Sequence, residues 1–579
     1  MLNCVSNSDF HRHTNGKPRI YTYCNRLIVT QLHLFIHSPM AKKKQKLTRN
    51  IVSLILATMA TVTLSAQPAG RPSLVVNIVV DGLSLDYINL LKDQFTDGGL
   101  QRIMRDGVTI TDLNFGSVLD PAASTAIVQT GASPAMNGVA SSMVYDRASR
   151  RTLSFFIDSS TLGNFTNETY SPRALRVSTI GDELRIASQG LNHVYSICPD
   201  AAQAIIMAGH KGNSAFWIDN TSGKWATSTY YKDAPYTIQT RNRMQPLDMR
   251  LDTMAWKSAL SPELYPDLPN YKKLYSFRHT FYRTDPQRIV HYKNTPLVNT
   301  EVTSIASDYI KSLSLGKGEN IDMLNLSYTV TPFIYGDDHD IRMEQMDSYI
   351  RLDREIKSLI TAIDTNGPGM DRTMIVITGL PSNVTRRRSK ENEWDTPAGE
   401  FSPRKAISLL NIYLIAIYGN GEWVIGYDQN QFYLNHELIK QRDIDLAAIR
   451  SESARFLNRM AGISEAQTID DIVAERIGET ATPPRRNINQ DFAADIYIST
   501  FPGWDIVDDG TVSPNPDTYP KIQRQTAPIA PAFILAPNIK SKTITGAVDP
   551  RAIAPTIASI LRIRSPNAAT QPPLRLDFK

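Results

Sequence analysis

Apolar residues along most of the chain fall into short continuous runs bounded by polar residues. The clearest run is "SLVVNIVVDG" (73–82), which ends in Asp-Gly. A run of β-branched apolar residues without polar alternation predicts a strand buried on both faces, as in a parallel sheet. Similar patterns predict further strands at 107–115, 193–198, 321–329, 373–378 and 531–536.

Segments with helical periodicity lie between these strands, the clearest at 85–95 and 341–364. Strands that alternate with helices predict an α/β fold with a mostly parallel central sheet flanked by helices. Two stretches fit this alternation poorly, at about 216–299 and 382–524. We interpret both as insertions at the carboxyl edge of the sheet, where open α/β folds bind ligands.

The N-terminal region has the pattern of a targeting segment. "MAKKKQKLTRN" (40–50) is basic, residues 51–64 are apolar, and small residues allow cleavage after Ala66. We therefore expect an upstream extension at 1–39, a signal peptide at 40–66 and an exported domain at 67–579. The apolar run is too short to span a bilayer comfortably. We expect a periplasmic, cell-surface or secreted protein that is not an integral membrane protein after cleavage.

The composition is that of a globular protein, with 42% hydrophobic and 21% charged residues. The formal net charge of +5 does not describe the predicted exported domain. Nine of the 62 basic residues lie before position 67, together with only one of the 57 acidic residues. The remainder is nearly neutral, which gives no electrostatic reason to expect a nucleic-acid partner. Cys198 is the one cysteine after position 66, so an intramolecular disulfide is impossible there and we expect a small core residue.

Five motifs together resemble the alkaline phosphatase superfamily. They are "LVVNIVVDGLSLDYI" (74–88), "TGASPAMNGVAS" (130–141), "AGHKGNSAFWIDNTSGKWATSTYY" (208–231), "DSYIRLDREI" (347–356) and "VDPRAIAPTIASILRI" (548–563). The likeness is to the zinc-dependent periplasmic phosphatases of the Bacteroidetes type and to the nucleotide pyrophosphatase/phosphodiesterase branch. This resemblance implies an alkaline-phosphatase-like core and a two-zinc site that lowers the pKa of a Ser or Thr nucleophile.

The resemblance places an aspartate ligand after the first strand and the nucleophile at a helix start. Asp81 matches the aspartate. The nucleophile position falls on Pro121, which has no hydroxyl, and Asp120-Pro121 instead predicts an N-cap followed by the first helical residue. Ser124 and Thr125 offer hydroxyl groups one turn further along and are candidate substitutes.

The remaining metal-ligand positions carry residues that cannot bind zinc. The resemblance implies an Asp-x-x-x-His motif, where this chain has Val330 and Ile334, and an Asp-His pair, where it has Leu380 and Pro381. A late histidine is also implied, and 516–528 contains none. Apolar residues in a former metal site remove buried charges that would be costly without the metal.

The leading hypothesis is a non-catalytic pseudophosphatase, without a cofactor, that binds an unknown protein or small-molecule ligand. The alternative is an active phosphomonoesterase or phosphodiesterase with a rearranged zinc site. That site would use Asp337, Asp338 and His339 of "GDDHD" and the hydroxyl of Ser124 or Thr125. We favour the other interpretation of "GDDHD", which is a solvated acidic turn before the long helix.

Overall fold

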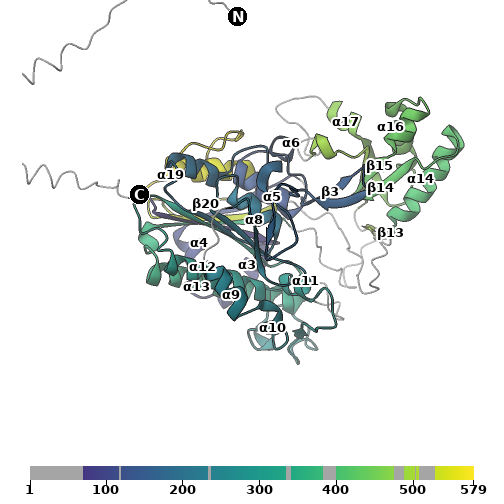
Figure 1. Cartoon of the computed structure of the whole chain (residues 1–579). Coiled ribbons are helices and arrows are strands. Elements are labelled where there is room, and N and C mark those ends of the chain that lie inside the picture. The colour runs from purple at the N-terminus through teal and green to yellow at the C-terminus, as the bar shows by residue number, and fades with distance from the viewer. Residues whose placement is uncertain are drawn as a thin grey trace, which may run out of the picture. The chain divides into compact units, whose positions relative to one another are not determined.

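The computed structural model describes residues 70–116, 119–231, 236–333, 341–381, 399–474, 488–501, 504–506 and 529–579. Within these ranges the largest feature is a ten-stranded sheet with the order β20-β2-β19-β12-β1-β11-β6-β7-β8-β5. Figure 1 shows helices on both sides of this layer of strands. Its strands are β1 (Leu74–Asp81), β2 (Val108–Asn114), β5 (Gly163–Asn164), β6 (Val194–Ile197), β7 (Ser214–Ile218), β8 (Trp225–Ser228), β11 (Asp322–Thr329), β12 (Thr373–Leu380), β19 (Ile529–Leu535) and β20 (Lys542–Ile544).

The centre of this sheet is parallel and its margins contain antiparallel pairs. β1 pairs in parallel with β11 and β12, so that Asp81 aligns with Thr329 on one side and Leu380 on the other. β6 and β7 continue the parallel order, whereas β19 runs antiparallel to β12 and β2, and β8 runs antiparallel to β7 and β5. The predicted α/β fold is confirmed, and the strands predicted from continuous apolar runs are its centre.

Helices cover both faces of the sheet because alternate residues of each strand point to opposite sides. Val76 and Ile78 lie in different apolar clusters from Val75 and Val79. The first cluster includes α3 (Leu85–Leu91), α4 (Leu100–Asp106), α12 (Leu297–Ser312) and α13 (Arg342–Asn366). The second includes α5 (Pro121–Thr130), α7 (Ile180–Ala187), α8 (Ala201–Ala208) and α19 (Ile553–Leu561).

The region predicted as an insertion at about 216–299 begins with residues of the central sheet. β7 and β8 contain the buried side chains of Phe216, Trp217 and Trp225. These aromatic residues interrupt the aliphatic pattern that marked the other strands, so the excursion from the sheet starts only after β8. Its elements are α9 (Tyr236–Met244), α10 (Leu247–Leu251), β9 (Ala255–Lys257), β10 (Arg278–Thr280) and α11 (Arg288–Lys293).

The described part of the region predicted at 382–524 builds a second, smaller sheet, which we call the lobe. β14 (Val424–Asp428), β15 (Gln431–Leu434), β17 (Ile496–Thr500) and β16 (Ile463–Thr468) form four antiparallel strands. α14 (Pro403–Tyr418) and α16 (Leu446–Leu457) lie beside these strands (Figure 1). They share an apolar core with the strands, which includes Leu410, Trp423 and Phe432. Shorter elements are β13 (Gly399–Phe401), α15 (His436–Gln441), α17 (Ile469–Ala474) and β18 (Trp504–Ile506).

Several sequence predictions lie outside the described residues. The proposed signal peptide falls before residue 70, and Ile334, Asp337, Asp338 and His339 fall between 333 and 341. Within the described ranges, no helix combines the length and the apolar character that a membrane crossing requires.

Candidate functional site

A pocket of about 220 Å³ lies at the carboxyl ends of β1 and β11. Its lining includes Asp81, Pro121, Asp200, Gln203 and Lys293. These residues come from the end of β1, the start of α5, the start of α8 and the end of α11. The carboxyl edge of a parallel sheet is the usual ligand-binding position of open α/β folds, so we take this pocket as the candidate functional site.

Asp81 lines this pocket, and among the described residues no positively charged side chain contacts it. Its Oδ1 accepts a hydrogen bond of 2.9 Å from Nε2 of Gln203. Burial of the carboxyl group and the nearby carboxyls of Asp200 and Asp120 raise the pKa of Asp81 to about 8, against the smaller effect of the Gln203 hydrogen bond. Removing a carboxylate from water favours its protonated form unless a charge compensates it.

The start of α5 has the predicted capped geometry. Asp120 is the N-cap, and its Oδ1 accepts a hydrogen bond of 2.8 Å from the backbone N–H of Ala122. The backbone N–H and the hydroxyl of Ser142 donate to the same carboxyl group. Pro121 is the first helical residue. The prediction of an N-cap and a first-turn proline is therefore confirmed, and this position offers neither a hydroxyl nor an N–H group.

Ser124 and Thr125 are buried in α5, one turn beyond Pro121. The Thr125 hydroxyl donates a hydrogen bond of 2.7 Å to the carbonyl of Pro121. Ser124 Oγ is buried and has no hydrogen-bond partner within the described part of the chain. Solvent therefore reaches neither of the two candidate hydroxyl groups in the described structure.

Two other positions that the resemblance assigns to metal ligands lie beside Asp81. The backbone N–H of Val330 donates to the carbonyl of Asp81, and the N–H of Gly82 donates to the carbonyl of Leu380. Val330 and Leu380 are buried apolar side chains. The fold thus places two buried apolar side chains beside Asp81, at positions where the resemblance implies metal ligands.

The described side chains around Asp81 do not fit a zinc centre. A catalytic zinc ion takes three protein ligands, from Cys, His, Asp or Glu, and leaves one position open for water. Across the ranges that the structure describes, no group of three or more such residues is arranged to hold a metal ion.

The cation that lines the pocket, Lys293, already has two hydrogen-bond acceptors beside it. None of these contacts was predicted from the sequence. Nζ of Lys293 donates to Oδ1 of Asp200 at 2.6 Å and to Oδ1 of Asn220 at 2.8 Å. Gln203 and Lys293 lie outside the five motifs, and only the fold brings α8, α11 and the turn after β7 to one place.

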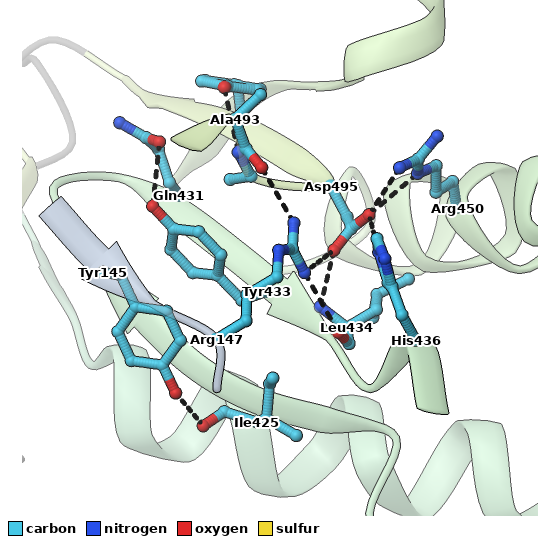
Figure 2. A network of polar contacts seen from close by, with 12 residues as sticks. Tyr145, Arg147, Ile425, Gln431, Tyr433, Leu434, His436, Arg450, Ala493 and Asp495 are labelled. Carbon is cyan, nitrogen blue, oxygen red and sulfur yellow. Dashed lines mark hydrogen bonds and ion pairs between the residues drawn. The ribbon is translucent and has the colours of Figure 1, made fainter. Parts of the chain in front are cut away.

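A second cluster of charges, which we call the Asp495 network, lies in the lobe (Figure 2). The Asp495 carboxyl group is fully buried and contacts Arg147 at 2.7 Å, Arg450 at 2.8 Å and His436 at 2.8 Å. The backbone N–H of Leu434 also donates to it at 2.7 Å. Burial on its own would raise the pKa of Asp495, but His436 and Arg147 bring it down to about 2.

The Asp495 network fixes a hairpin against the lobe. The hairpin consists of β3 (Met143–Asp146) and β4 (Arg151–Ser154), and Arg147 follows β3 directly. Arg147 also donates to the carbonyls of Leu434 and Ala493, and its guanidinium lies 5.0 Å from the centre of the Tyr433 ring. This contact pattern is that of a structural connection rather than of a ligand site.

Residues 75–521 match the model of the type I phosphodiesterase / nucleotide pyrophosphatase family, and the chain belongs to this family. It is 24% identical to alkaline phosphatase PhoV of Synechococcus elongatus, over 87% of this chain and 92% of that protein. It is also 24% identical to alkaline phosphatase PafA of Elizabethkingia meningoseptica, over 87% of this chain and 94% of that protein. A protein named calcium-transporting ATPase from Myroides odoratus is 25% identical over 91% of this chain and 98% of its own length.

The crystal structure of wild-type PafA has the same fold. It superposes with a TM-score of 0.74 at 22% identity and covers 88% of this chain and 99% of that chain. The predicted resemblance to the alkaline phosphatase superfamily is therefore confirmed, both by the family match and by the architecture.

Proposed function

We propose that this protein is a non-catalytic member of the phosphatase superfamily that binds a ligand at the carboxyl-edge pocket. The observation that carries the proposal is Pro121, which occupies the expected nucleophile position as the first residue of a capped helix. A proline can neither attack phosphorus nor donate a hydrogen bond to a developing oxyanion.

The charges around the pocket support this proposal. Asp81 and Asp200 line it together with one cation, Lys293, whose charge is already engaged by Asp200. Among the described residues, a phosphoryl group that enters this pocket would meet two carboxyls and no free cation. Catalysis of phosphoryl transfer depends on positive charge around the transferred oxygens.

The place of action that we propose is the periplasm or the cell surface. It rests on the basic and apolar pattern of residues 40–66, which has the form of a cleaved signal peptide. The partner would be a protein or a small molecule, since the near-neutral remainder of the chain offers no electrostatic attraction for nucleic acid.

A second candidate is an active hydrolase with a relocated metal site. It is favoured by one observation: the pocket-lining residue Thr331 shortly precedes Asp337, Asp338 and His339 in the chain. Carboxylates and an imidazole could together hold a divalent ion. Ser124 and Thr125 are buried, so such a site would need a water molecule as its nucleophile.

The two candidates are separated by hydrolysis assays with phosphomonoester, phosphodiester and pyrophosphate substrates in the presence of zinc or magnesium. We expect no turnover above the buffer rate, either for the natural chain or for Pro121→Thr, because the new hydroxyl would have no metal ion to lower its pKa. Pro134→Thr, at the start of another helix, α6 (Pro134–Asn137), is the matched control for the loss of a first-turn proline. Zinc-dependent turnover that disappears in Asp338→Ala would overturn the proposal and establish the relocated site.

A further inference from the structure

Helix α14 of the lobe is apolar on two opposite faces. Its inner face packs into the lobe core through Leu410 and Leu414, which are buried. On its outer face Leu409 is 48% exposed, Ile412 64% and Ile415 37%. Exposed aliphatic side chains scattered singly are ordinary, but a contiguous row along one helix marks an interaction surface.

The outer face has a symmetric sequence about Ile412. Residues three or four positions apart lie on one side of a helix, so Ser408, Leu409, Ile412, Ile415 and Ala416 form one exposed stripe. Leu409 and Ile415 are equally far from Ile412 in sequence, and so are the two small residues, Ser408 and Ala416. In an antiparallel pair centred on Ile412 the two aliphatic residues therefore face each other, and so do the two small ones, so that the stripe is complementary to a second copy of itself, as an interface with twofold symmetry requires.

The charge of the first turn favours the same arrangement. Lys405 lies in the first turn of α14, which has no acidic residue, and the last turn has no basic residue. A cation is unfavourable at the positive N-terminal end of its own helix and favourable at the negative C-terminal end of another. In an antiparallel pair centred on Ile412, Lys405 of one copy lies opposite Gly419, the C-cap of the other.

We propose that α14 is a self-association surface, through which two copies of this chain pair antiparallel with Ile412 on the twofold axis. Leu409 of each copy then packs against Ile415 of the other, and the small residues Ser408 and Ala416 allow the helices to approach closely. One helix pair buries less area than the roughly 1,200–2,000 Å² of a standard interface, so the dimer exchanges with monomer at micromolar concentrations. The inference is independent of the pocket and of catalysis.

The first test measures the molecular mass of the full chain by sedimentation equilibrium from low to high micromolar concentration. We expect the mass to rise toward that of a dimer, and Ile412→Glu to remain a monomer at every concentration. The matched control is Ile186→Glu on α7, where the natural residue is similarly exposed at 52%. The control should dimerise as the natural chain does, and both variants should keep its melting temperature, because surface substitutions change stability little.

The second test determines by disulfide cross-linking whether the two α14 helices pair antiparallel. Cys198 is buried, so a chain with Cys4 and Cys24 replaced by serine is a background without accessible thiols. Helices packed about 8–10 Å apart bring facing Cα atoms within the distance that a disulfide requires. Ile412→Cys should cross-link with itself, and Ser408→Cys should cross-link with Ala416→Cys when the two chains are mixed.

Three results would overturn the proposal. The first is a natural chain that stays monomeric at all concentrations. The second is association that Ile186→Glu removes as completely as Ile412→Glu does. The third is a Ser408→Cys chain that cross-links with itself as readily as with Ala416→Cys, because that result indicates parallel pairing or random collision.

Discussion

Two aspartates of this protein lie in enclosed positions and have opposite electrostatic surroundings. Asp81, at the end of β1, contacts the amide of Gln203 and lies near two other carboxyls, and its pKa is raised to about 8. Asp495, in the lobe, contacts three basic side chains and a backbone N–H group, and its pKa is lowered to about 2. The same chemical group is therefore compensated in one region and uncompensated in the other.

This difference shows that the Asp495 network is built to hold a charged carboxylate, whereas the surroundings of Asp81 are not. The Asp495 network supplies its own cations, which stabilise a buried carboxylate. At Asp81, a zinc phosphatase would supply the positive charge as metal ions, and bound ions invert the local pKa behaviour. Here the neighbouring positions are Pro121, Val330 and Leu380, whose side chains offer no ligand atom for zinc. Under the proposed function, the carboxyl edge keeps the fold of the family and lacks the charges that phosphoryl transfer needs.

The largest effect is expected from Asp495→Ala. The substitution leaves Arg147, Arg450 and His436 without their shared partner, and breaking a buried ion pair on one side costs about 3–5 kcal/mol. The free energy of unfolding from urea denaturation measures the loss. The matched control is Asp470→Ala, which removes a half-exposed partner of the same Arg450 and should cost less than about 1 kcal/mol. Equal losses of stability in the two variants would show that the buried carboxylate contributes no more than an exposed one.

Acid should weaken the same network. The pKa of Asp495 is about 2 in the folded protein and close to its usual value in the unfolded chain. Its stabilisation is therefore fully present above about pH 4 and is lost as the pH falls through 2, with a size of about 2 kcal/mol. The measurement is the free energy of unfolding of the natural chain and of Asp495→Asn between pH 5 and pH 2. The difference in the free energy of unfolding between the natural chain and Asp495→Asn should decrease as the pH falls. A difference that stays constant would contradict the low pKa of Asp495.

The contrasting substitution, Asp81→Asn, should be harmless. Asparagine keeps an oxygen that can accept from Gln203, and it removes a carboxyl group that lies near Asp120 and Asp200 without a cation. The free energy of unfolding at neutral pH should stay the same or rise by about 1 kcal/mol. With its pKa raised to about 8, the Asp81 carboxyl group must take up a proton when the chain folds at pH 7, which costs stability, and asparagine needs no proton. A loss as large as that of Asp495→Asn would mean that Asp81 has a charged partner after all.

The centre of the fold could be predicted from the sequence because its signal is local. Runs of apolar residues at 73–82, 321–329 and 373–378 gave β1, β11 and β12, and the periodicity at 341–364 gave α13. The lobe could not be predicted in the same way. Its strands are short and half-exposed, and their pairing joins segments such as β15 and β17 that lie far apart in the chain.

The candidate site could be predicted only in part, for a related reason. Asp81 and the capped start at Asp120 and Pro121 follow from patterns within a few residues of one another. The contacts of Lys293 with Asp200 and of Arg147 with Asp495 join residues from distant segments. No local sequence pattern predicts such pairs, because a single basic residue is most often solvated.

The central claim is that the carboxyl edge holds no zinc centre, and the melting temperature of the purified protein tests it most directly. The chain is melted with added zinc, with magnesium and with a chelator. A metal ion that binds the folded state at a hundredfold above its Kd would add about 2.7 kcal/mol of stability, which is readily measured. We predict three superimposable melting curves. A higher melting temperature with zinc that is lost in Asp81→Asn would contradict the claim.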